Sequence, residues 1–332
     1  MMKIPLTCLV LLAALPLVAA AQEPPTPPTP PSTPAPPSSY MWKDKAKYHY
    51  RHNHGDEDQD SETIDTTVAF SGPGGVVDLS IMSGTIAVHG WSRNEAKIHA
   101  TNDEGRIEFE HSPSRILLDV RHHSGDSEFD VTVPYGTRVL MRSNSGDLHT
   151  EGVKGPLEAR TVSGEVRVSD IVGDAIIDGV SGDVEARNID GNLRVSCVSG
   201  GITLSSVHGD IDASGVSGDI SLPNGKSRNV HMESVSGNLT YGGTVSSDGR
   251  YDLHSHSGDI TLRAPSDVGA SLSLETFSGT IESEFRIMLN LGTRGHGNSE
   301  QHIDTTLGNG GAHITIETFS GDIHLERLSS SQ

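Results

Sequence analysis

The chain has 332 residues, of which 37 are glycine and only 4% are aromatic. Its 24 basic and 44 acidic residues give a formal net charge of −20, which disfavours binding to nucleic acid or to bare anionic lipid. Many glycines and few aromatics favour one long repeat array over two ordinary globular domains.

Residues 1–21 have the pattern of a secretory signal peptide. Lys3 gives a weakly basic start, an apolar stretch runs from Leu6 to Ala20, and small residues precede a cleavage site expected after Ala21. No later stretch is long and apolar enough for a transmembrane anchor. We therefore expect an exported protein that is periplasmic, at the cell surface or secreted. Cleavage leaves Cys197 as the single cysteine, so no internal disulfide is expected.

Residues 22–62 are predicted to form a disordered linker. The first part, Glu23 to Pro37, is rich in Pro and Thr and is typical of a semi-rigid extended spacer. The second part mixes Lys, Tyr, His and Asp without a strand or helix period. Its histidines His49, His52 and His54 are weak candidate ligands for Zn²⁺ or Cu²⁺, and a solvated arm is the simpler interpretation.

A nine-residue repeat dominates the middle of the chain. Each unit has the form apolar-x-apolar-x-x-apolar-x-Gly-x, in which the first two apolar residues share one side of a strand and glycine permits the turn. The repeating glycines are Gly146, Gly155, Gly164, Gly173, Gly182, Gly191, Gly200, Gly209 and Gly218. Glycine at this frequency argues against helices.

Alternate units place a serine before the glycine, so the true repeat is an eighteen-residue coil of two strands and two turns. One coil has too little apolar surface to fold alone, whereas stacked coils bury a continuous core. We predict an all-β fold, a β-solenoid or β-helix of roughly 18–21-residue coils over residues 63–328, followed by a tail at 329–332. The N-terminal part, from Thr63 to Val139, is a possible capping sheet.

The repeat also predicts which side chains point into the core. The residues expected to point inward are Ala159, Val162, Val168, Ile171, Ile177, Val180, Ala186, Ile189, Val195, Val198, Leu204, Val207, Ala213 and Val216. Later Ser-Gly pairs begin at Ser236, Ser257, Ser278 and Ser320, and the wider spacing is expected to reflect longer loops. Part of the Gly- and Asn-rich stretch between Glu284 and Ala312 is expected to protrude as a loop.

These motifs together resemble the bacterial putative-adhesin family of β-solenoid repeat domains. The similarity rests on the Ser-Gly-Asp units, on Ser83-Gly84-Thr85-Ile86, on the Val131-x-Val133-Pro134 step and on the closing segment Glu317–Ile323. It covers roughly residues 63–328. The resemblance implies an exported or membrane-attached repeat domain with a surface or envelope-stress role, and it offers no catalytic residues.

Aspartates after the glycines are the remaining candidates for chemistry. Asp183 and Asp219 should stack along one edge and Asp174 and Asp210 along the other, which makes all four weak candidate Ca²⁺ ligands. A calcium roll, however, needs further glycines in each unit that this chain lacks, so turn formation is the simpler role. The recurring serines are turn residues, and Cys197 is expected to be a small filler rather than a reactive thiol. No catalytic residues and no cofactor are predicted.

The sequence therefore favours an exported, non-enzymatic envelope scaffold or binding module, similar to an adhesin. Its partner would be an unknown envelope protein or a glycan, not a nucleic acid. Two alternatives remain: a carbohydrate-active enzyme built on a β-helix, and a Ca²⁺-dependent adhesion module.

Overall fold

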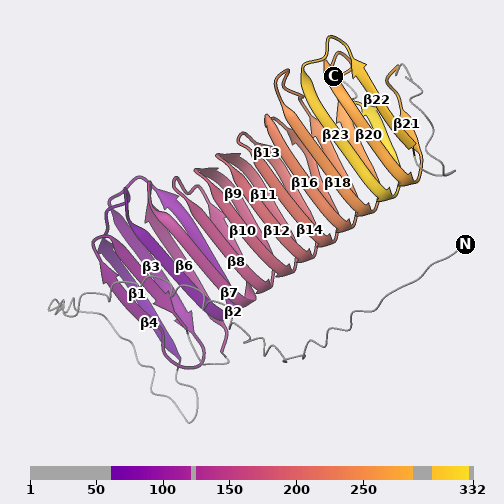
Figure 1. Ribbon diagram of the computed structural model, residues 1–332. Coiled ribbons are helices and arrows are strands. Elements are labelled where there is room, and N and C mark those ends of the chain that lie inside the picture. Colours follow the sequence, from indigo (N-terminus) through magenta and orange to yellow (C-terminus); the bar gives the residue numbers. More distant parts are fainter. Residues whose placement is uncertain (1–60, 121–124, 287–300, 329–332) are drawn as a thin grey trace, which may run out of the picture. The chain divides into compact units, whose positions relative to one another are not determined.

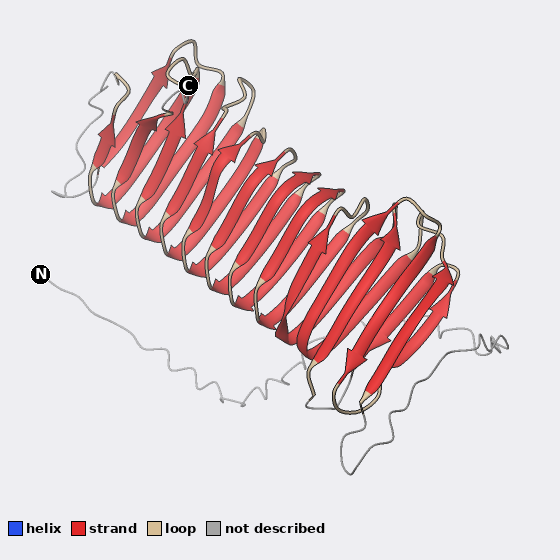
Figure 2. Ribbon diagram, turned by 180° about the vertical axis from the view of Figure 1, so that it is seen from behind, coloured by secondary structure: helices blue, strands red, loops and turns tan. Residues whose placement is uncertain are grey.

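The computed structural model describes residues 61–120, 125–286 and 301–328. Contacts divide the chain into residues 1–46 and 47–332, and all described residues belong to the second unit. They form strands and turns, and none of the described segments is a helix able to cross a membrane. The strands stack in two rows that face each other across an aliphatic core (Figures 1 and 2). The predicted all-β solenoid is confirmed.

The strands of both rows hydrogen-bond to their neighbours from one end of the stack to the other. The first row runs in the spatial order β4 (Glu108–Ser112), β5 (Arg115–Asp119), β2 (Val76–Trp91), β7 (Arg138–Glu151), β8 (Leu157–Ser163), β10 (Ala175–Ser181), β12 (Leu193–Ser199), β14 (Ile211–Ser217), β16 (Asn229–Ser236), β18 (Arg250–Ser257), β23 (Ala312–Ser320), β20 (Ala270–Ser278) and β22 (Gln301–Leu307). The second row runs β1 (Glu62–Ala69), β3 (Glu95–Asn102), β6 (Ser127–Pro134), the far halves of β2 and β7, β9 (Val166–Val172), β11 (Val184–Asp190), β13 (Ile202–Val207), β15 (Ile220–Gly225), β17 (Leu239–Gly243), β19 (Ile260–Ala264), β24 (Ile323–Arg327) and β21 (Ile281–Ser283).

Strands of the first row alternate between core and solvent until their last two residues, which both face solvent. In β8 the side chains of Leu157, Ala159 and Thr161 are buried, so the intervening Val162 points outward and is 47% exposed. The inward orientation expected for Val162, Val180, Val198 and Val216 is therefore wrong, and all four are 45–47% exposed. Because side chains alternate along a strand, a residue that directly follows a buried one points to solvent. The other residues expected to point inward are buried.

Strands of the second row keep their third apolar residue inside because one residue leaves the strand conformation. Asp170, Asn188 and Ser206 have φ values of 56°, 53° and 54°, in the left-handed region. The extra residue is skipped in the pairing, as in a β-bulge, and it turns Ile171, Ile189 and Val207 back into the core. The two halves of a coil thus differ although their sequence patterns match.

Glycine is required at the turns because neighbouring coils touch there. Gly182 has φ of 119°, and a Cβ atom at this position would lie 2.2 Å from the carbonyl oxygen of Gly164 in the preceding coil. Neither the dihedral nor the space admits a side chain. The nine-residue glycine period therefore reports a close approach of one backbone to the next.

The N-terminal end of the stack is closed by antiparallel strands. β1 pairs with β3, and β3 with β6, at the end of the second row, while β4 pairs with β5 at the end of the first. Phe129 and Ile98 from these strands are fully buried. Antiparallel strands thus cap this end as expected, but the cap is smaller than the range 63–139, because β2 pairs in parallel with β5, β6 and β7 and belongs to the stack.

The C-terminal coil does not stack last. β23 lies between β18 and β20, and β24 lies between β19 and β21, all in parallel pairing (Figure 1). The spacing of 42 residues between Ser278 and Ser320 therefore does not mark one coil with a long loop. The chain passes one coil position, builds β20 and β21, adds β22 antiparallel at the edge, and then returns to fill the gap.

A glycine-rich crossing makes this return possible. The backbone at residues 308–311 crosses over the connection before β20, where the amide of Ala312 donates to the carbonyl of Gly269 at 3.3 Å. A Cβ atom on Gly269 would lie 2.7 Å from the carbonyl oxygen of Gly310. The stretch between Glu284 and Ala312, part of which was expected to protrude as a loop, thus contains β22 and a tight crossing, and its residues 287–300 lie outside the described residues.

Candidate functional site

The outer surface of the last four strands of the first row gathers polar and aromatic side chains. We call the outward side chains of β18, β23, β20 and β22 the C-terminal face. Because the strands are in register, these side chains form crosswise rows. From one end of the strands to the other, the rows are Arg250, His313, Ser271 and Thr306; Asp252, Thr315, Ser273 and Asp304; His254, Glu317, Glu275 and His302; and His256, Phe319 and Phe277.

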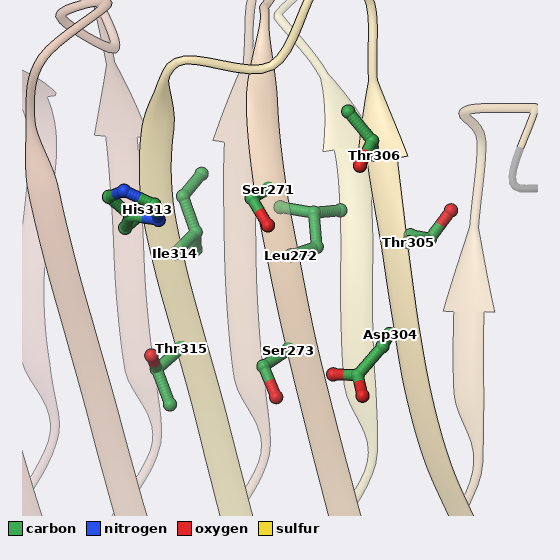
Figure 3. A pocket seen from close by; sticks show the side chains of 9 residues that line it. All are labelled: Ser271, Leu272, Ser273, Asp304, Thr305, Thr306, His313, Ile314 and Thr315. Carbon is green, nitrogen blue, oxygen red and sulfur yellow. The ribbon is translucent and has the colours of Figure 1, made fainter. Parts of the chain in front are cut away.

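A hollow of about 480 Å³ lies in the first two rows (Figure 3). Two small residues of β20, Ser271 and Ser273, lie between larger side chains on the neighbouring strands. Asp304 and Thr306 border the hollow from β22, and His313 and Thr315 from β23. Buried residues complete the lining: Leu272, Thr305 and Ile314. The hollow thus offers hydroxyl, carboxylate and imidazole groups to a ligand.

A histidine between two carboxylates borders the hollow. His302 lies with Nε2 3.0 Å from Asp304 Oδ2 and with Nδ1 3.4 Å from Glu275 Oε2. The hydrogen bond with Asp304, together with the charges of Asp304 and Glu275, raises the pKa of His302 above its usual 6.5. Hydrogen bonds with His302 and Ser273 lower the pKa of Asp304 below 3.8. Both shifts favour the charged pair.

A second histidine–carboxylate pair lies beside the first. His254 Nδ1 is 3.3 Å from Glu317 Oε2, and its ring lies 5.9 Å from that of His231 on β16. Glu317 and Glu275 occupy partner positions on adjacent strands, so the row places two carboxylates side by side between two histidines. This row carries the densest titratable chemistry of the face.

An aromatic ladder forms the last row. Phe319 stacks between His256, at 5.0 Å between ring centroids, and Phe277, at 4.8 Å, and the rings are nearly parallel. Phe277 and Phe319 remain 47% and 50% exposed. The C-terminal face therefore ends in a row of stacked rings whose phenylalanines are about half exposed to solvent.

The aspartates singled out from the sequence lie at the corners between the two rows of strands. Asp183 and Asp219 occupy one corner, where Oδ1 of each accepts a hydrogen bond of 2.8 Å from the backbone amide one coil further on, in Gly201 and Asn238. Each carboxylate therefore bonds to a neighbouring coil, which is the role of a turn residue.

The other corner repeats this arrangement. Oδ1 of Asp174 accepts from the amide of Asn192 at 3.0 Å, and Asp210 accepts from the Asn229 side chain at 2.9 Å. The structure thus separates the four aspartates into two pairs. Across the described ranges, no three His, Cys, Asp or Glu side chains are arranged to hold a metal ion. His49, His52 and His54 lie outside the described residues.

Cys197 is buried at the core side of β12. Its Sγ contacts the carbonyl oxygen of Gly182 at 3.4 Å, and burial raises the pKa of the thiol. A protonated, enclosed thiol is a poor nucleophile. The position is shared with Thr161, Gly179 and Gly215 of the neighbouring coils, all small residues.

Sequence reasoning did not find the C-terminal face, although one signal was present. The hexapeptides Leu274–Gly279 and Ile316–Gly321, LETFSG and IETFSG, are almost identical and lie on adjacent strands. Such near-identity, at a spacing of 42 residues, could have indicated neighbouring coils. The hollow itself depends on β22, whose antiparallel edge position no repeat pattern encodes.

Comparison with solved structures returns distant similarities. A putative cell adhesion protein from Clostridium sporogenes is 12% identical, covering 80% of this chain and 99% of that one at a TM-score of 0.23. A putative lipid binding protein from Parabacteroides distasonis is 12% identical, with coverages of 81% and 97% and a TM-score of 0.45. A putative adhesin from Bacteroides fragilis is 11% identical, with coverages of 79% and 96% and a TM-score of 0.33. Scores this low carry no functional weight.

Comparison with curated proteins returns no match. The model of one protein family, in contrast, matches twice, at residues 131–242 and 215–326. These ranges begin within β6 and end within β24, so they contain the coils from β7 onward, the inserted C-terminal coil and the C-terminal face. The match extends over more than half of the chain and agrees with the resemblance seen in the sequence. The chain belongs to the Toastrack DUF4097 family.

Proposed function

We propose that this protein is an exported, non-enzymatic binding module of the bacterial envelope, similar to an adhesin, and that its C-terminal face binds a glycan. The observation that carries the proposal is the open hollow beside the histidine–carboxylate row. Sugars present many hydroxyl groups, which pair with Ser, Thr and carboxylate oxygens in directional hydrogen bonds. The signal-peptide pattern at residues 1–21 supports export.

The rigidity of the site favours binding without prior rearrangement. The side chains that line the hollow lie on three strands paired along their length, and Asp304 is oriented by hydrogen bonds with His302 and Ser273. Groups held in place before binding lose less entropy on association. A repeating solenoid then serves as the support that presents this face.

Titration calorimetry of the full chain with purified envelope polysaccharides tests the proposal. Ser273→Trp should fill the hollow and abolish binding, because Ser273 lies on the central strand of the hollow. Ser214→Trp, on the outward side of β14 and away from the hollow, is the matched control and should bind normally. If no polysaccharide binds, or if S273W binds as well as the control, the assignment of this face is wrong.

A second candidate is glycan hydrolysis, favoured by one observation. Glu275 and Glu317 lie at partner positions beside the hollow, and hydrolysis of glycosidic bonds uses paired carboxylates. Each already contacts a histidine, which fits a structural role as well. Incubating any polysaccharide that binds and assaying for new reducing ends separates the two functions. Release that disappears in Glu317→Gln would establish an enzyme.

A further inference from the structure

A continuous line of exposed apolar side chains runs along the first row of strands. We call it the valine stripe: Val162, Val180, Val198, Val216 and Val235, one from each of β8, β10, β12, β14 and β16, each 45–47% exposed. The serines that follow them pair in register from coil to coil, so the valines stand in one column. The column continues into the aromatic ladder of the C-terminal face.

Strand propensity does not explain the stripe. The same five strands carry two other outward columns, and both are mainly polar. One reads Glu158, Ile176, Arg194, Asp212 and His231, and the other Arg160, Asp178, Ser196, Ser214 and Glu233. The valines differ from the other two columns in place, because each lies at the end of its strand where the coil-to-coil pairing skips one residue. All three columns face solvent, and an end position does not by itself require an apolar side chain, so the valines add exposed apolar surface that folding of the strands does not demand.

The charges beside the stripe are negative. Asp183 and Asp219 follow it at the corner, and neither makes an ion pair with any residue of the described ranges. Glu233 borders the other side, where its ion pair among the described residues is with His231 at 3.8 Å and its partner position on β18 is His254. Arg160, at the start of the stripe, is held in ion pairs with Glu158 and Asp178. An apolar line between carboxylates complements a partner that is apolar along one line and basic on both sides.

The spacing of the valines indicates the conformation of that partner. Coils repeat at about 4.8 Å, close to the roughly 5.4 Å between turns of an α-helix, whereas alternate residues of an extended chain are about 6.6 Å apart. Five valines span about 19 Å, the length of about 13 helical residues. Lys and Arg on the flanks of a helix can extend along the apolar surface and reach carboxylates with their ends.

We propose that the valine stripe is a docking surface for a cationic amphipathic helix of a partner protein, separate from the glycan site proposed above. A second copy of this chain is the poorer occupant, because stripe-to-stripe contact would bring carboxylate against carboxylate. Bare anionic lipid is repelled for the same reason.

A designed 14-residue helix of Leu and Lys, with leucines on one face, is the probe, and a scrambled peptide of the same composition is its control. The affinity of the full chain is measured by fluorescence anisotropy. Val198→Thr/Val216→Thr keeps the shape and removes apolar surface, so affinity should fall about tenfold. The matched variant Val172→Thr/Ile176→Thr changes two exposed apolar residues off the stripe and should leave affinity within about twofold.

Neutralising the aspartates beside the valine stripe is the second test in the same binding assay. In Asp183→Asn/Asp219→Asn the amide oxygen can still accept the backbone hydrogen bond, as Asn192 and Asn238 do. Affinity for the peptide and its salt dependence should both decrease. The proposal is overturned if the peptide does not bind, if the scrambled peptide binds equally, or if stripe and control variants weaken binding alike. It is also overturned if the chain sediments as a dimer that V198T/V216T separates, because the stripe would then be a self-association surface.

Discussion

In each of three successive coils, one residue of the second row turns the next apolar side chain into the core. Asp170, Asn188 and Ser206 adopt left-handed dihedrals, and each returns the next apolar side chain to the core. A side chain in this region costs about 1 kcal/mol relative to glycine, least for Asn and Asp. The sequence therefore tolerates strain at one position per coil to keep the core filled on both sides.

Ser206→Gly is predicted to raise the free energy of unfolding by about 0.5 kcal/mol, because glycine adopts the left-handed conformation without strain. Ser206→Val should lower it by about 1–2 kcal/mol. The neighbouring Ser205→Gly is the control, and it should destabilise by up to about 1 kcal/mol because Ser205 lies in ordinary strand conformation. Urea denaturation measures the free energy of unfolding of all three variants. Equal effects at the two serines would contradict the left-handed conformation assigned to Ser206.

His302 should make stability depend on pH. Its pKa is raised in the folded chain, so its contribution is present below 6.5 and is lost as pH rises through the folded value. The pKa of Asp304 is lowered, so its contribution is present above 3.8 and is lost as pH falls through the folded value. The pair therefore stabilises most between these limits.

His302→Gln should lower the melting temperature at about pH 5.5 and have a smaller effect at about pH 8.5. The same substitution in an Asp304→Asn/Glu275→Gln background serves as the reference, and there the pH dependence should vanish. If H302Q is equally harmful at both pH values in both backgrounds, His302 contributes by packing rather than by charge.

At the scale of strands and turns, the repeat predicted the solenoid but not its asymmetry. A glycine every nine residues indicated the turns correctly, because close backbone contact excludes any side chain there. It could not show which half of the coil contains the left-handed residue, since Asp, Asn and Ser are ordinary residues of exposed strands. The four outward valines were placed inside for that reason, and with them the valine stripe was missed.

The inserted coil escaped prediction for a different reason. Sequence periodicity assumes that consecutive coils are neighbours, whereas β23 pairs with residues of β18 and β20 that precede their partners by 63 and 42 positions. The C-terminal face depends on this arrangement, so its hollow could not be inferred from single-strand patterns. The repeat did predict which Ser-Gly pairs form the turns beside the C-terminal face.

Removal of residues 308–332 is predicted to destabilise the C-terminal end far more than its length suggests. β18 and β20 would each lose a parallel neighbour, and unpaired edges promote aggregation. Hydrogen exchange at β18 should accelerate strongly, and the shortened chain should precipitate on mild heating. A peptide of residues 308–328 added in trans should reverse both effects. Deletion of residues 329–332 alone is the control, and unchanged exchange in both deletions would contradict a supporting role for the coil.

At the scale of the whole stack, charge accumulates along the corners. Carboxylates of neighbouring coils repeat at about 4.8 Å, and their repulsion is screened by salt. Asparagine or glycine interrupts the rows, and backbone amides donate to the acids, which limits the repulsion.

Added NaCl is therefore predicted to raise the melting temperature slightly. CaCl₂ at matched ionic strength should add little, because Asp174, Asp183, Asp210 and Asp219 each bond to a neighbouring coil and lie in two separate corners. Melting curves in the two salts decide between the alternatives. A large rise specific to calcium would make Ca²⁺-dependent adhesion the leading function.

The insertion of β23 and β24 also constrains the time course of folding. A polypeptide emerges from the ribosome N-terminus first, and a simple solenoid could add coils in that order as they appear. Here the native neighbour of β18 is made only after β20, β21 and β22, because β23 follows them in the chain. The stack can therefore be completed only after β23 and β24 have been made, and a chain cut short before Ala312 carries an open seam between β18 and β20.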